Sequence, residues 1–288
     1  MRGPDTTRHV FQRLQRPVAA MRDDARKARE APAHNRPITG EPMRAMASLI
    51  PLTCISMTDA SIAPPLTGET IDRDRLRRLL ADAQCAPHFA QCDFDGADLS
   101  DLDLRGAQFV GCSFAEATLR KTLLTDTRWT ACRARQADFQ MADLTDARFT
   151  ACDLNNTGWH RARLSATRFT EVKLTGAHFH EAQVLGIGFH DSLLAGADLR
   201  GMSFRKQTLE RLDLSDADLA GCDFRDAVFE GGSLRDANLK NARFDGADLR
   251  SVDLGGLRIA NVAQLFKGAI ISSDQAATLI GELGIRVL

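Results

Sequence analysis

Seven cysteines offer the first candidate chemistry, and four of them recur at intervals of 20 residues: Cys92, Cys112, Cys132 and Cys152. Thiols at a fixed spacing could hold a metal ion or form disulfides. However, a straight line of thiols cannot supply the tetrahedral geometry that zinc prefers. Alanine and threonine also alternate with these cysteines at positions a multiple of five residues away, such as Ala97 and Thr127. We therefore interpret the four cysteines as reduced packing residues of a core, which agrees with a cytoplasmic protein.

Three histidines form the second candidate site. A 20-residue repeat would stack His160 on His180, with His178 beside them, and imidazoles bind transition metals. Nothing in the pattern orients the rings, as ligand histidines require, so we interpret them as surface residues. The acidic run at residues 93–98 lacks the spacing and the closing glutamate of a calcium loop. With no catalytic set either, the sequence predicts neither an enzyme nor a bound metal or cofactor.

Three arginines repeat at the same interval, at Arg128, Arg148 and Arg168. We expect an outward basic column, because charged side chains seldom lie in a core. Such a column would attract an anion or an acidic partner. The alternative is a solvated ladder whose charge is balanced by Glu171 and neighbouring acids.

A period of five residues must position all these groups. From Phe89 to Ile259 every fifth residue is apolar without interruption, and most of these residues are leucine or phenylalanine. The residue two places earlier is usually small, and the other three are mostly polar. This period fits neither a helix of 3.6 residues per turn nor a strand with alternating faces. It indicates a repeat architecture.

Four five-residue sides would close into a square coil of 20 residues, and such coils would stack about 4.8 Å apart. The recurrence of cysteine and arginine at the interval of one such coil supports this geometry independently. The sequence therefore predicts an all-β solenoid, a quadrilateral β-helix of nearly nine coils with the large residue of each side at its centre. Ala134 is the weak point of the predicted core, and we expect the bulky Trp129 to lean into the space it leaves.

One side of this predicted coil is the most acidic of the four, and we expect it to be the partner-binding face. Its carboxylates are Asp93, Asp95, Glu116, Asp153, Asp213, Asp216, Asp236 and Asp253.

Six segments resemble the A-[D/N]-L-x-x motif of the pentapeptide-repeat proteins. They are ADLSD (97–101), ADFQM (137–141), ADLRG (197–201), ADLAG (217–221), ANLKN (237–241) and ADLRS (247–251). The resemblance implies that the β-helix is right-handed. It implies little about function, because one fold can serve many functions.

The chain before the repeats has a different composition. Residues 1–66 are rich in arginine, alanine and proline, and we expect a mostly disordered basic extension. Two alternatives stay open: a secretion signal of a bacterial effector, or a later translation start. Residues 67–88 are predicted to be a short cap with a helix over 70–84, or an irregular first coil. The β-helix follows over 89–260, and a C-terminal helix and tail over 261–288.

The predicted C-terminal helix begins at a capping box, with Ser272 as N-cap and Gln275 three residues later. Gly284 is placed to end the helix. An apolar stripe consists of Ala276, Leu279, Ile280, Leu283, Ile285, Val287 and Leu288. The stripe suits a plug over the last coil and a two-fold dimer contact equally well.

Both ends of the chain resemble the Qnr group of quinolone-resistance proteins within this family. The similar segments are GETIDRDRL (68–76), QCDFDGADL (91–99) and QAATLIGELGIRV (275–287). The resemblance implies a homodimer joined through the terminal helix, and an acidic rod that imitates DNA and binds DNA gyrase or topoisomerase IV. The chain departs from that group in having no loop that interrupts the repeat, as in loop-free gyrase inhibitors of the mycobacterial type. Its acidic character is also modest.

The formal net charge of −1 argues against direct nucleic-acid binding. No apolar run reaches the roughly 20 residues of a membrane helix. The leading hypothesis is a non-catalytic, DNA-mimicking protein of the bacterial cytoplasm that modulates a type II topoisomerase or protects it from quinolones. The alternative is a secreted effector or scaffold that presents one face of the β-helix to a protein partner.

Overall fold

The computed structural model describes residues 65–83, 85–256, 265–281 and 284–286. The predicted basic extension and its alternative as a secretion signal therefore lie almost entirely outside the described residues. None of the described helices is long and apolar enough to cross a membrane.

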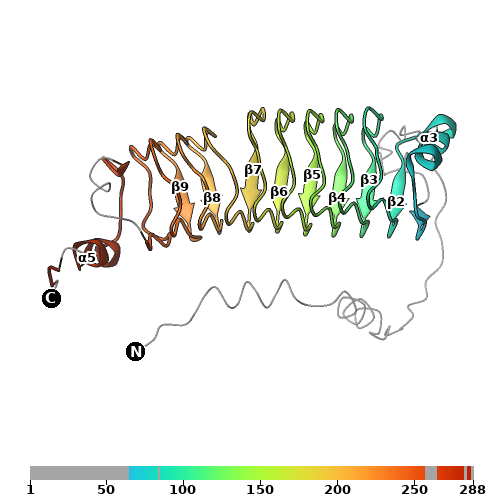
Figure 1. The fold of residues 1–288 in the computed structure, drawn as a ribbon. Coiled ribbons are helices and arrows are strands. Elements are labelled where there is room, and N and C mark those ends of the chain that lie inside the picture. The colour runs from blue at the N-terminus through green and yellow to red at the C-terminus, as the bar shows by residue number, and fades with distance from the viewer. Residues whose placement is uncertain (1–64, 84, 257–264, 282–283, 287–288) are drawn as a thin grey trace, which may run out of the picture. The chain divides into compact units, whose positions relative to one another are not determined.

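Parallel strands in sequence order form one edge-to-edge stack (Figure 1). The strands are β1 (Leu66–Thr67), β2 (His88–Ala90), β3 (Gln108–Val110), β4 (Arg128–Thr130), β5 (Arg148–Thr150), β6 (Arg168–Thr170), β7 (Gly188–His190), β8 (Thr208–Glu210) and β9 (Val228–Glu230). From β2 onward each strand pairs with the equivalent strand of the next repeat, as Phe89 does with Phe109. This register confirms the predicted coil length.

Isolated parallel bridges with the same sequence interval join the coils on the other three sides. Asp93 is bridged to Ser113, Asp98 to Thr118 and Asp103 to Leu123. We call the side with the Asp93 bridge the acidic side, the side with the Asp98 bridge the histidine side and the side with the Asp103 bridge the fourth side. The side that contains β2–β9 is the strand side. Four ladders around one axis confirm the quadrilateral β-helix.

The core lies along the axis of the coils. Every described fifth position from Phe89 to Leu254 is buried except Val184, which is half-buried. Aromatic rings stack from coil to coil, as Phe149 does on Phe169 with centroids 5.1 Å apart and planes 10° apart. Burial of one large side chain per five residues is the main stabilising term of this fold.

Trp129 stacks on Phe149 of the next coil, with centroids 5.3 Å and planes 20° apart, but it also approaches a ring of the neighbouring column. Its ring is tilted by 57° to Phe114, with the centroids 4.8 Å apart. Phe114 is the column neighbour of Ala134, which is itself fully buried. The indole therefore reaches the column that Phe114 and Ala134 share.

Tight corners separate the sides. They explain why the place two residues after each apolar centre residue is mostly polar or glycine. The corner residues have positive φ, as at Gly96 (64°) and Asp101 (59°). Glycine, aspartate and asparagine tolerate this left-handed conformation better than other residues do.

The stack is weakest between β7 and β8. Among the described residues only His190 and Glu210 are paired there, whereas β6 and β7 share three pairs. The same coil contains the half-buried Val184 and the adjoining Leu185, which is 84% exposed. A smaller centre residue gives this coil less apolar contact, which agrees with the thinner ladder.

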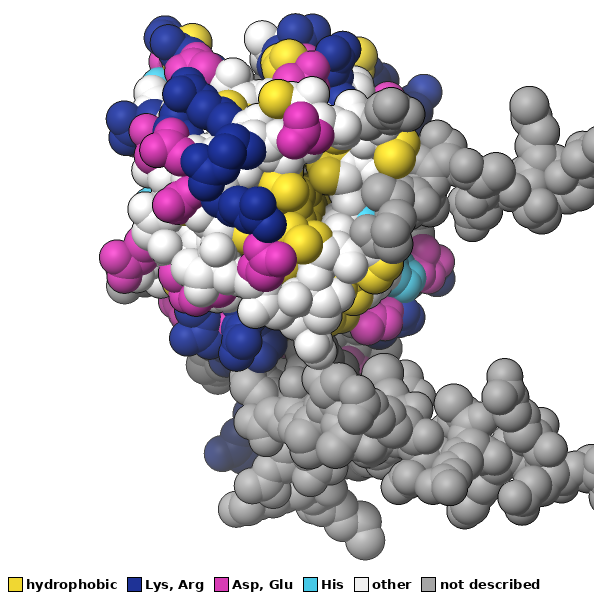
Figure 2. Space-filling model, turned by 90° about the vertical axis from the view of Figure 1, so that its right-hand side faces the viewer, with side chains coloured by type: hydrophobic (Ala, Val, Ile, Leu, Met, Phe, Trp, Pro, Cys, Tyr) yellow, Lys and Arg dark blue, Asp and Glu magenta, His cyan; other side chains and the backbone are white. Residues whose placement is uncertain are grey.

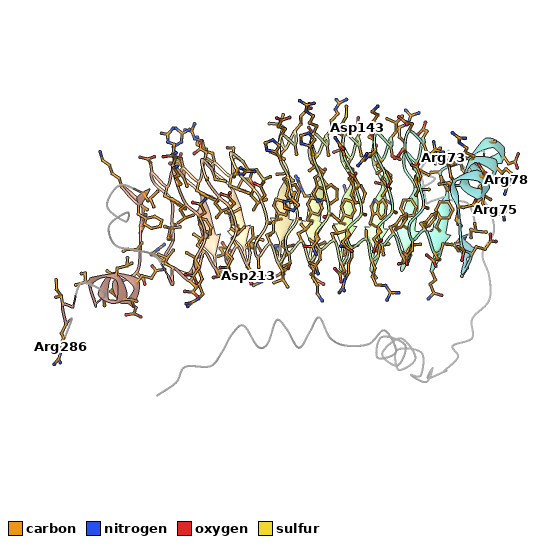
Figure 3. The ribbon with its side chains drawn as sticks, in the orientation of Figure 1. Arg73, Arg75, Arg78, Asp143, Asp213 and Arg286 are labelled. Carbon is orange, nitrogen blue, oxygen red and sulfur yellow. The ribbon has the colours of Figure 1, made fainter. Side chains whose placement is uncertain are left out.

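Helix α3 (Arg73–Asp82) covers the first coil. The Asp72 side chain caps the helix by accepting a hydrogen bond from the backbone N–H of Arg75, at 2.7 Å. Arg73, which Figure 3 labels on this helix, donates to the carbonyl oxygens of Asp98 and Ser100, at 2.9 and 2.8 Å. The helix lies within a first coil that is longer than the later ones, since β1 pairs in parallel with β2 through Leu66 and Phe89. Cap helix and irregular first coil thus occur together.

Helix α5 (Ser273–Gly281) lies at the other end. The capping box is present: Ser272 N–H donates to Gln275 Oε1 at 2.7 Å, and Gln275 N–H donates to Ser272 Oγ at 3.2 Å. The Gln275 amide also donates to the carbonyl oxygens of Leu249 and Val252, at 2.7 and 2.8 Å. The Val252 carbonyl is one that the backbone of a further coil would otherwise satisfy, whereas the Leu249 carbonyl also accepts from the Val252 N–H at 3.2 Å. Leu279 is buried. Helix α5 therefore caps the described stack.

Candidate protein-interaction surfaces

The eight carboxylates predicted to form one face do lie on a single side. Bridges join Asp93, Asp153, Asp213 and Asp253 into one ladder with the residues between them, and the other four lie two or three places further along the same side. Figure 3 shows Asp213 at the opposite edge of the stack from Asp143 of the fourth side.

Several of these carboxylates are bound within the chain. Asp153 forms an ion pair with Arg135 at 2.7 Å, and Asp253 forms one with Arg235 at 2.9 Å. Asp95 accepts hydrogen bonds from the Ser113 hydroxyl at 2.5 Å and from a backbone N–H at 2.7 Å. Such groups are partly neutralised, so the acidic side has less free negative charge than eight carboxylates would give.

Three members of the set remain free among the described residues. Glu116, Asp216 and Asp236 are exposed corner residues with φ between 55° and 58°, and no described group hydrogen-bonds or ion-pairs with their side chains. They project from the edge of the acidic side. A cationic partner would meet these three carboxylates without first breaking an internal contact.

Aspartates that precede a centre residue have a structural role that the sequence analysis missed. Asp93 and Asp213, for example, each accept a hydrogen bond from the backbone N–H two residues later, at 2.9 and 3.1 Å. This is an Asx turn, which satisfies a backbone donor at the corner. Aspartate in the A-D-L-x-x pattern therefore stabilises the fold whether or not it contacts a partner.

Four of these aspartates also hold an arginine two residues later in a two-pronged ion pair. The signal in the sequence is D-L-R or D-F-R, and the pairs are Asp103–Arg105, Asp198–Arg200, Asp223–Arg225 and Asp248–Arg250. None of them lies on the acidic side. The hydrogen bond from Arg225 lowers the pKa of Asp223 to about 2. Fork-to-carboxylate pairing of this kind is the strongest form of surface ion pair.

The basic column is formed as expected. Arg128, Arg148 and Arg168 begin three successive strands, are register partners, and are exposed. Arg168 donates to the carbonyl oxygen of Gly186. Within the described part of the chain the three guanidinium groups have no carboxylate partner, and Glu171 does not pair with them. The column thus has unpaired positive charge on the strand side.

The predicted apolar stripe of α5 is divided between two environments. Leu279 is buried and Ala276 is half-buried, whereas Ile280 and Ile285 are 40% and 54% exposed. The remaining members, Leu283, Val287 and Leu288, lie outside the described residues. One part of the stripe therefore packs on the last coil, and another part faces away from it.

The cysteine column is buried within the core. Cys112 and Cys132 donate weak hydrogen bonds to the carbonyl oxygens of Phe89 and Phe109, at 3.5 and 3.4 Å. Burial also raises the pKa of the Cys222 thiol, which lies on the fourth side and outside this column, to about 12. Protonated, inaccessible thiols of this kind are packing residues rather than ligands or nucleophiles.

A shallow hollow of about 670 Å³ lies where α3 meets the first coils. Leu80, Ala83 and Leu102 contribute apolar lining, with Arg77 and Arg105 beside them. Figure 2 views this end of the stack and shows dark blue Lys and Arg side chains beside a yellow apolar area. The hollow is wide open, unlike the enclosed pockets that bind small molecules.

Family models match most of the repeat region. A model of the pentapeptide repeat region matches residues 86–159 and 142–218, and a model of eight pentapeptide repeats matches residues 217–256. No curated protein sequence matches the chain.

Solved structures with similar folds include two pentapeptide-repeat proteins. QnrB1, a plasmid-mediated fluoroquinolone resistance protein, is 24% identical with a TM-score of 0.47, over 79% of this chain and 99% of that one. HetL, involved in heterocyst differentiation regulation in the cyanobacterium Nostoc sp. strain PCC 7120, is 24% identical with a TM-score of 0.37, over 74% of this chain and 89% of HetL.

Proposed function

The chain belongs to the pentapeptide-repeat proteins, and on that basis we propose that it is a non-catalytic binding protein whose target is a bacterial type II topoisomerase, DNA gyrase or topoisomerase IV. The observation that carries the proposal is the acidic side. Glu116, Asp216 and Asp236 present free carboxylates along one edge of the stack of coils. A cationic groove built for a polyanionic rod would attract such an edge.

The charge density limits how this binding can work. DNA carries one negative charge per roughly 1.7 Å of helix axis, whereas successive coils rise by about 4.8 Å and many carry no free carboxylate on this side. Charge alone therefore cannot replace DNA. Shape and contact area of the rod must supply much of the affinity, while the carboxylates orient the encounter.

The two ends of the chain support the same target. The segments similar to the Qnr group, residues 68–76 and 91–99, include the start of α3 and the first regular coil. The third segment begins at Gln275, the residue that binds α5 to the last described coil. The resemblance thus involves residues that build both caps, in addition to the repeat shared by the whole family.

Supercoiling of DNA by gyrase and decatenation of DNA by topoisomerase IV test the proposal. Purified chain is titrated into DNA gyrase, and separately into topoisomerase IV, with and without a fluoroquinolone. We expect either inhibition of the enzyme or recovery of its activity in the presence of the drug. If neither enzyme responds in any arm, the proposed target is wrong.

A further inference from the structure

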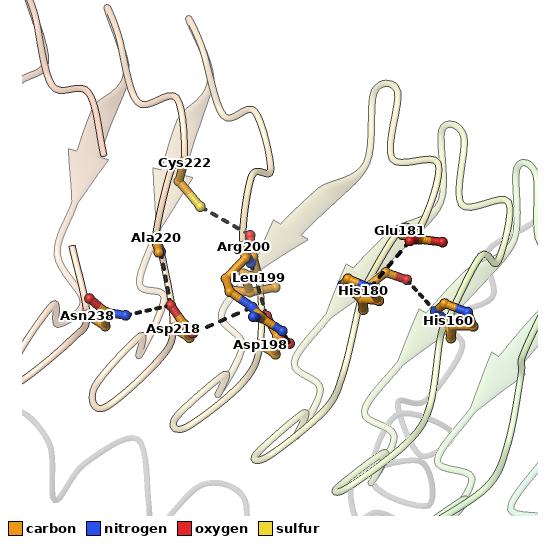
Figure 4. A network of polar contacts seen from close by, with 10 residues as sticks. All are labelled: His160, His180, Glu181, Asp198, Leu199, Arg200, Asp218, Ala220, Cys222 and Asn238. Atoms are coloured by element: carbon orange, nitrogen blue, oxygen red, sulfur yellow. Dashed lines mark hydrogen bonds and ion pairs between the residues drawn. The ribbon is translucent and has the colours of Figure 1, made fainter. Parts of the chain in front are cut away.

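His160, His180 and Glu181 meet on the histidine side, apart from the acidic side. The two imidazole rings stack on adjacent coils with centroids 5.4 Å apart and planes within 8°. One nitrogen of each ring and one oxygen of Glu181 all lie within 4.8 Å of one another. Figure 4 shows the three side chains grouped on neighbouring coils.

The backbone orients the first ring. Nδ1 of His160 lies 3.2 Å from the carbonyl oxygen of His180. Because a carbonyl oxygen can only accept, Nδ1 must carry the proton, and Nε2 keeps the lone pair that a metal needs. A backbone carbonyl is a common partner for the second nitrogen of a ligand histidine. The expectation that nothing orients these rings was therefore wrong for His160.

An arginine orients the carboxylate. Arg161 Nε donates to Glu181 Oε2 at 2.7 Å. The other oxygen, Oε1, lies 3.5 Å from Nε2 of His180. Glu181 thus has one oxygen held by Arg161 and the other 3.5 Å from a ring nitrogen of His180.

The separations suit a small cation after a modest closure. Ligand atoms about 2.0–2.1 Å from a tetrahedral zinc ion lie about 3.3 Å from one another. The His180–Glu181 pair is already close to that separation. The remaining approach is short for side chains that are partly exposed, since exposed rotamers interconvert readily.

Two imidazoles and one carboxylate select a class of metal. Imidazole binds zinc, copper and nickel, whereas calcium and magnesium require mainly oxygen ligands. We propose that His160, His180 and Glu181 form a binding site for a late first-row divalent cation, with Zn²⁺ as its probe. Water completes the coordination, because the cluster is open to solvent.

Zn²⁺ titration of the full chain without an affinity tag, followed by calorimetry at neutral pH, tests this site. We expect His160→Ala and His180→Ala each to weaken binding of one Zn²⁺ equivalent by at least about tenfold, as loss of a ligand or its support does. Mg²⁺ should not compete. Circular dichroism melting of each variant verifies that the fold is retained.

His178 provides a matched control. It lies on the same coil and side as His180 and is exposed, but it is not part of the three-residue cluster. His178→Ala should bind Zn²⁺ as the parent chain does. The site is refuted if both cluster variants bind normally, or if His178→Ala loses as much affinity as they do. Neither result bears on topoisomerase binding, which is proposed for another side.

Discussion

Arg225 holds both carboxylate oxygens of Asp223, donating from Nε at 2.8 Å and from Nη2 at 2.6 Å. The backbone N–H of Arg225 donates to the same carboxylate at 3.1 Å. Three donors to one ionised group explain why the pKa of Asp223 falls to about 2, chiefly through the hydrogen bond with the Arg225 side chain.

Asp223→Asn should lower stability at neutral pH and have little effect in strong acid. Because the folded-state pKa lies below the unfolded value of about 3.9, the contribution is complete above that value and is lost as the pH falls through about 2. We expect a loss of about 1 kcal/mol at pH 7, near the upper end for a surface ion pair. Unfolding free energies of both proteins between pH 2 and pH 7 test this, and a difference that does not change with pH would contradict it.

Thr127→Val should destabilise the core by about 1–3 kcal/mol, the cost of a buried donor without a partner. The Trp129 indole N–H donates to Thr127 Oγ1 at 3.0 Å, and valine preserves the shape while removing that acceptor. Trp159 and Thr157 form the same pair at 2.8 Å. Urea unfolding provides the measurement.

The double variant Thr127→Val/Trp129→Phe is the control for this pair. Phenylalanine has no N–H group, so the loss in the double variant should be smaller than the sum of the two single losses, although the bond from the Thr127 hydroxyl to the Leu124 carbonyl at 2.7 Å is lost in both Thr127 variants. Strictly additive losses would show that the hydrogen bond does not couple the two residues.

Gly232→Ala should destabilise the chain more than Gly196→Ala. Both glycines have positive φ, 88° and 65°, which costs alanine about 1 kcal/mol. A Cβ at Gly232 would come within 2.1 Å of the carbonyl oxygen of Leu212, whereas nothing lies within 4 Å of one at Gly196. The losses in melting temperature of the two variants separate the cost of the backbone conformation, which both share, from the cost of the clash, which only Gly232→Ala has. Equal losses would mean that the coils can part at Gly232 without cost.

The fold could be predicted because every side of a coil must place one apolar residue on the axis. This packing requirement is visible in the sequence as an apolar residue at every fifth position. Even the exception, Val184, is the smallest centre residue of its neighbourhood. The ion pairs were harder to predict from the sequence. Asp153 and Arg135, for example, lie on neighbouring coils and meet only when the coils stack. The carbonyl that orients His160 belongs to the backbone and has no signature in the sequence. The sequence therefore located the sides, but it could not show which charges on them stay free.

Neutralising the free carboxylates of the acidic side should weaken topoisomerase binding. The variant combines Glu116→Gln, Asp216→Asn and Asp236→Asn, which remove three charges and break no internal ion pair among the described residues. Because charges at the edge of an interface mainly accelerate association, we expect the association rate to fall and its salt dependence to decrease. Surface plasmon resonance with immobilised gyrase at several salt concentrations measures both.

A second triple variant controls for net charge. Asp101, Asp126 and Asp146 are also exposed corner residues, with φ of 59° to 60°, but they lie on the histidine and fourth sides. Changing them to asparagine removes the same charge from elsewhere on the stack. Equal effects of the two variants would mean that net charge, and not the acidic side, governs binding.

The exposed half of the α5 stripe predicts self-association through this helix. Ile280 and Ile285 are 40% and 54% exposed, whereas Leu279 is buried within the same chain. If the exposed residues meet a second copy, Ile280→Asp should shift the protein from dimer to monomer in sedimentation equilibrium with little change in its melting temperature. Leu279→Asp should instead lower the melting temperature, because it places a charge in the contact between α5 and the last coil. A monomeric parent chain would show that α5 serves as a cap alone, with Ile280 left in water.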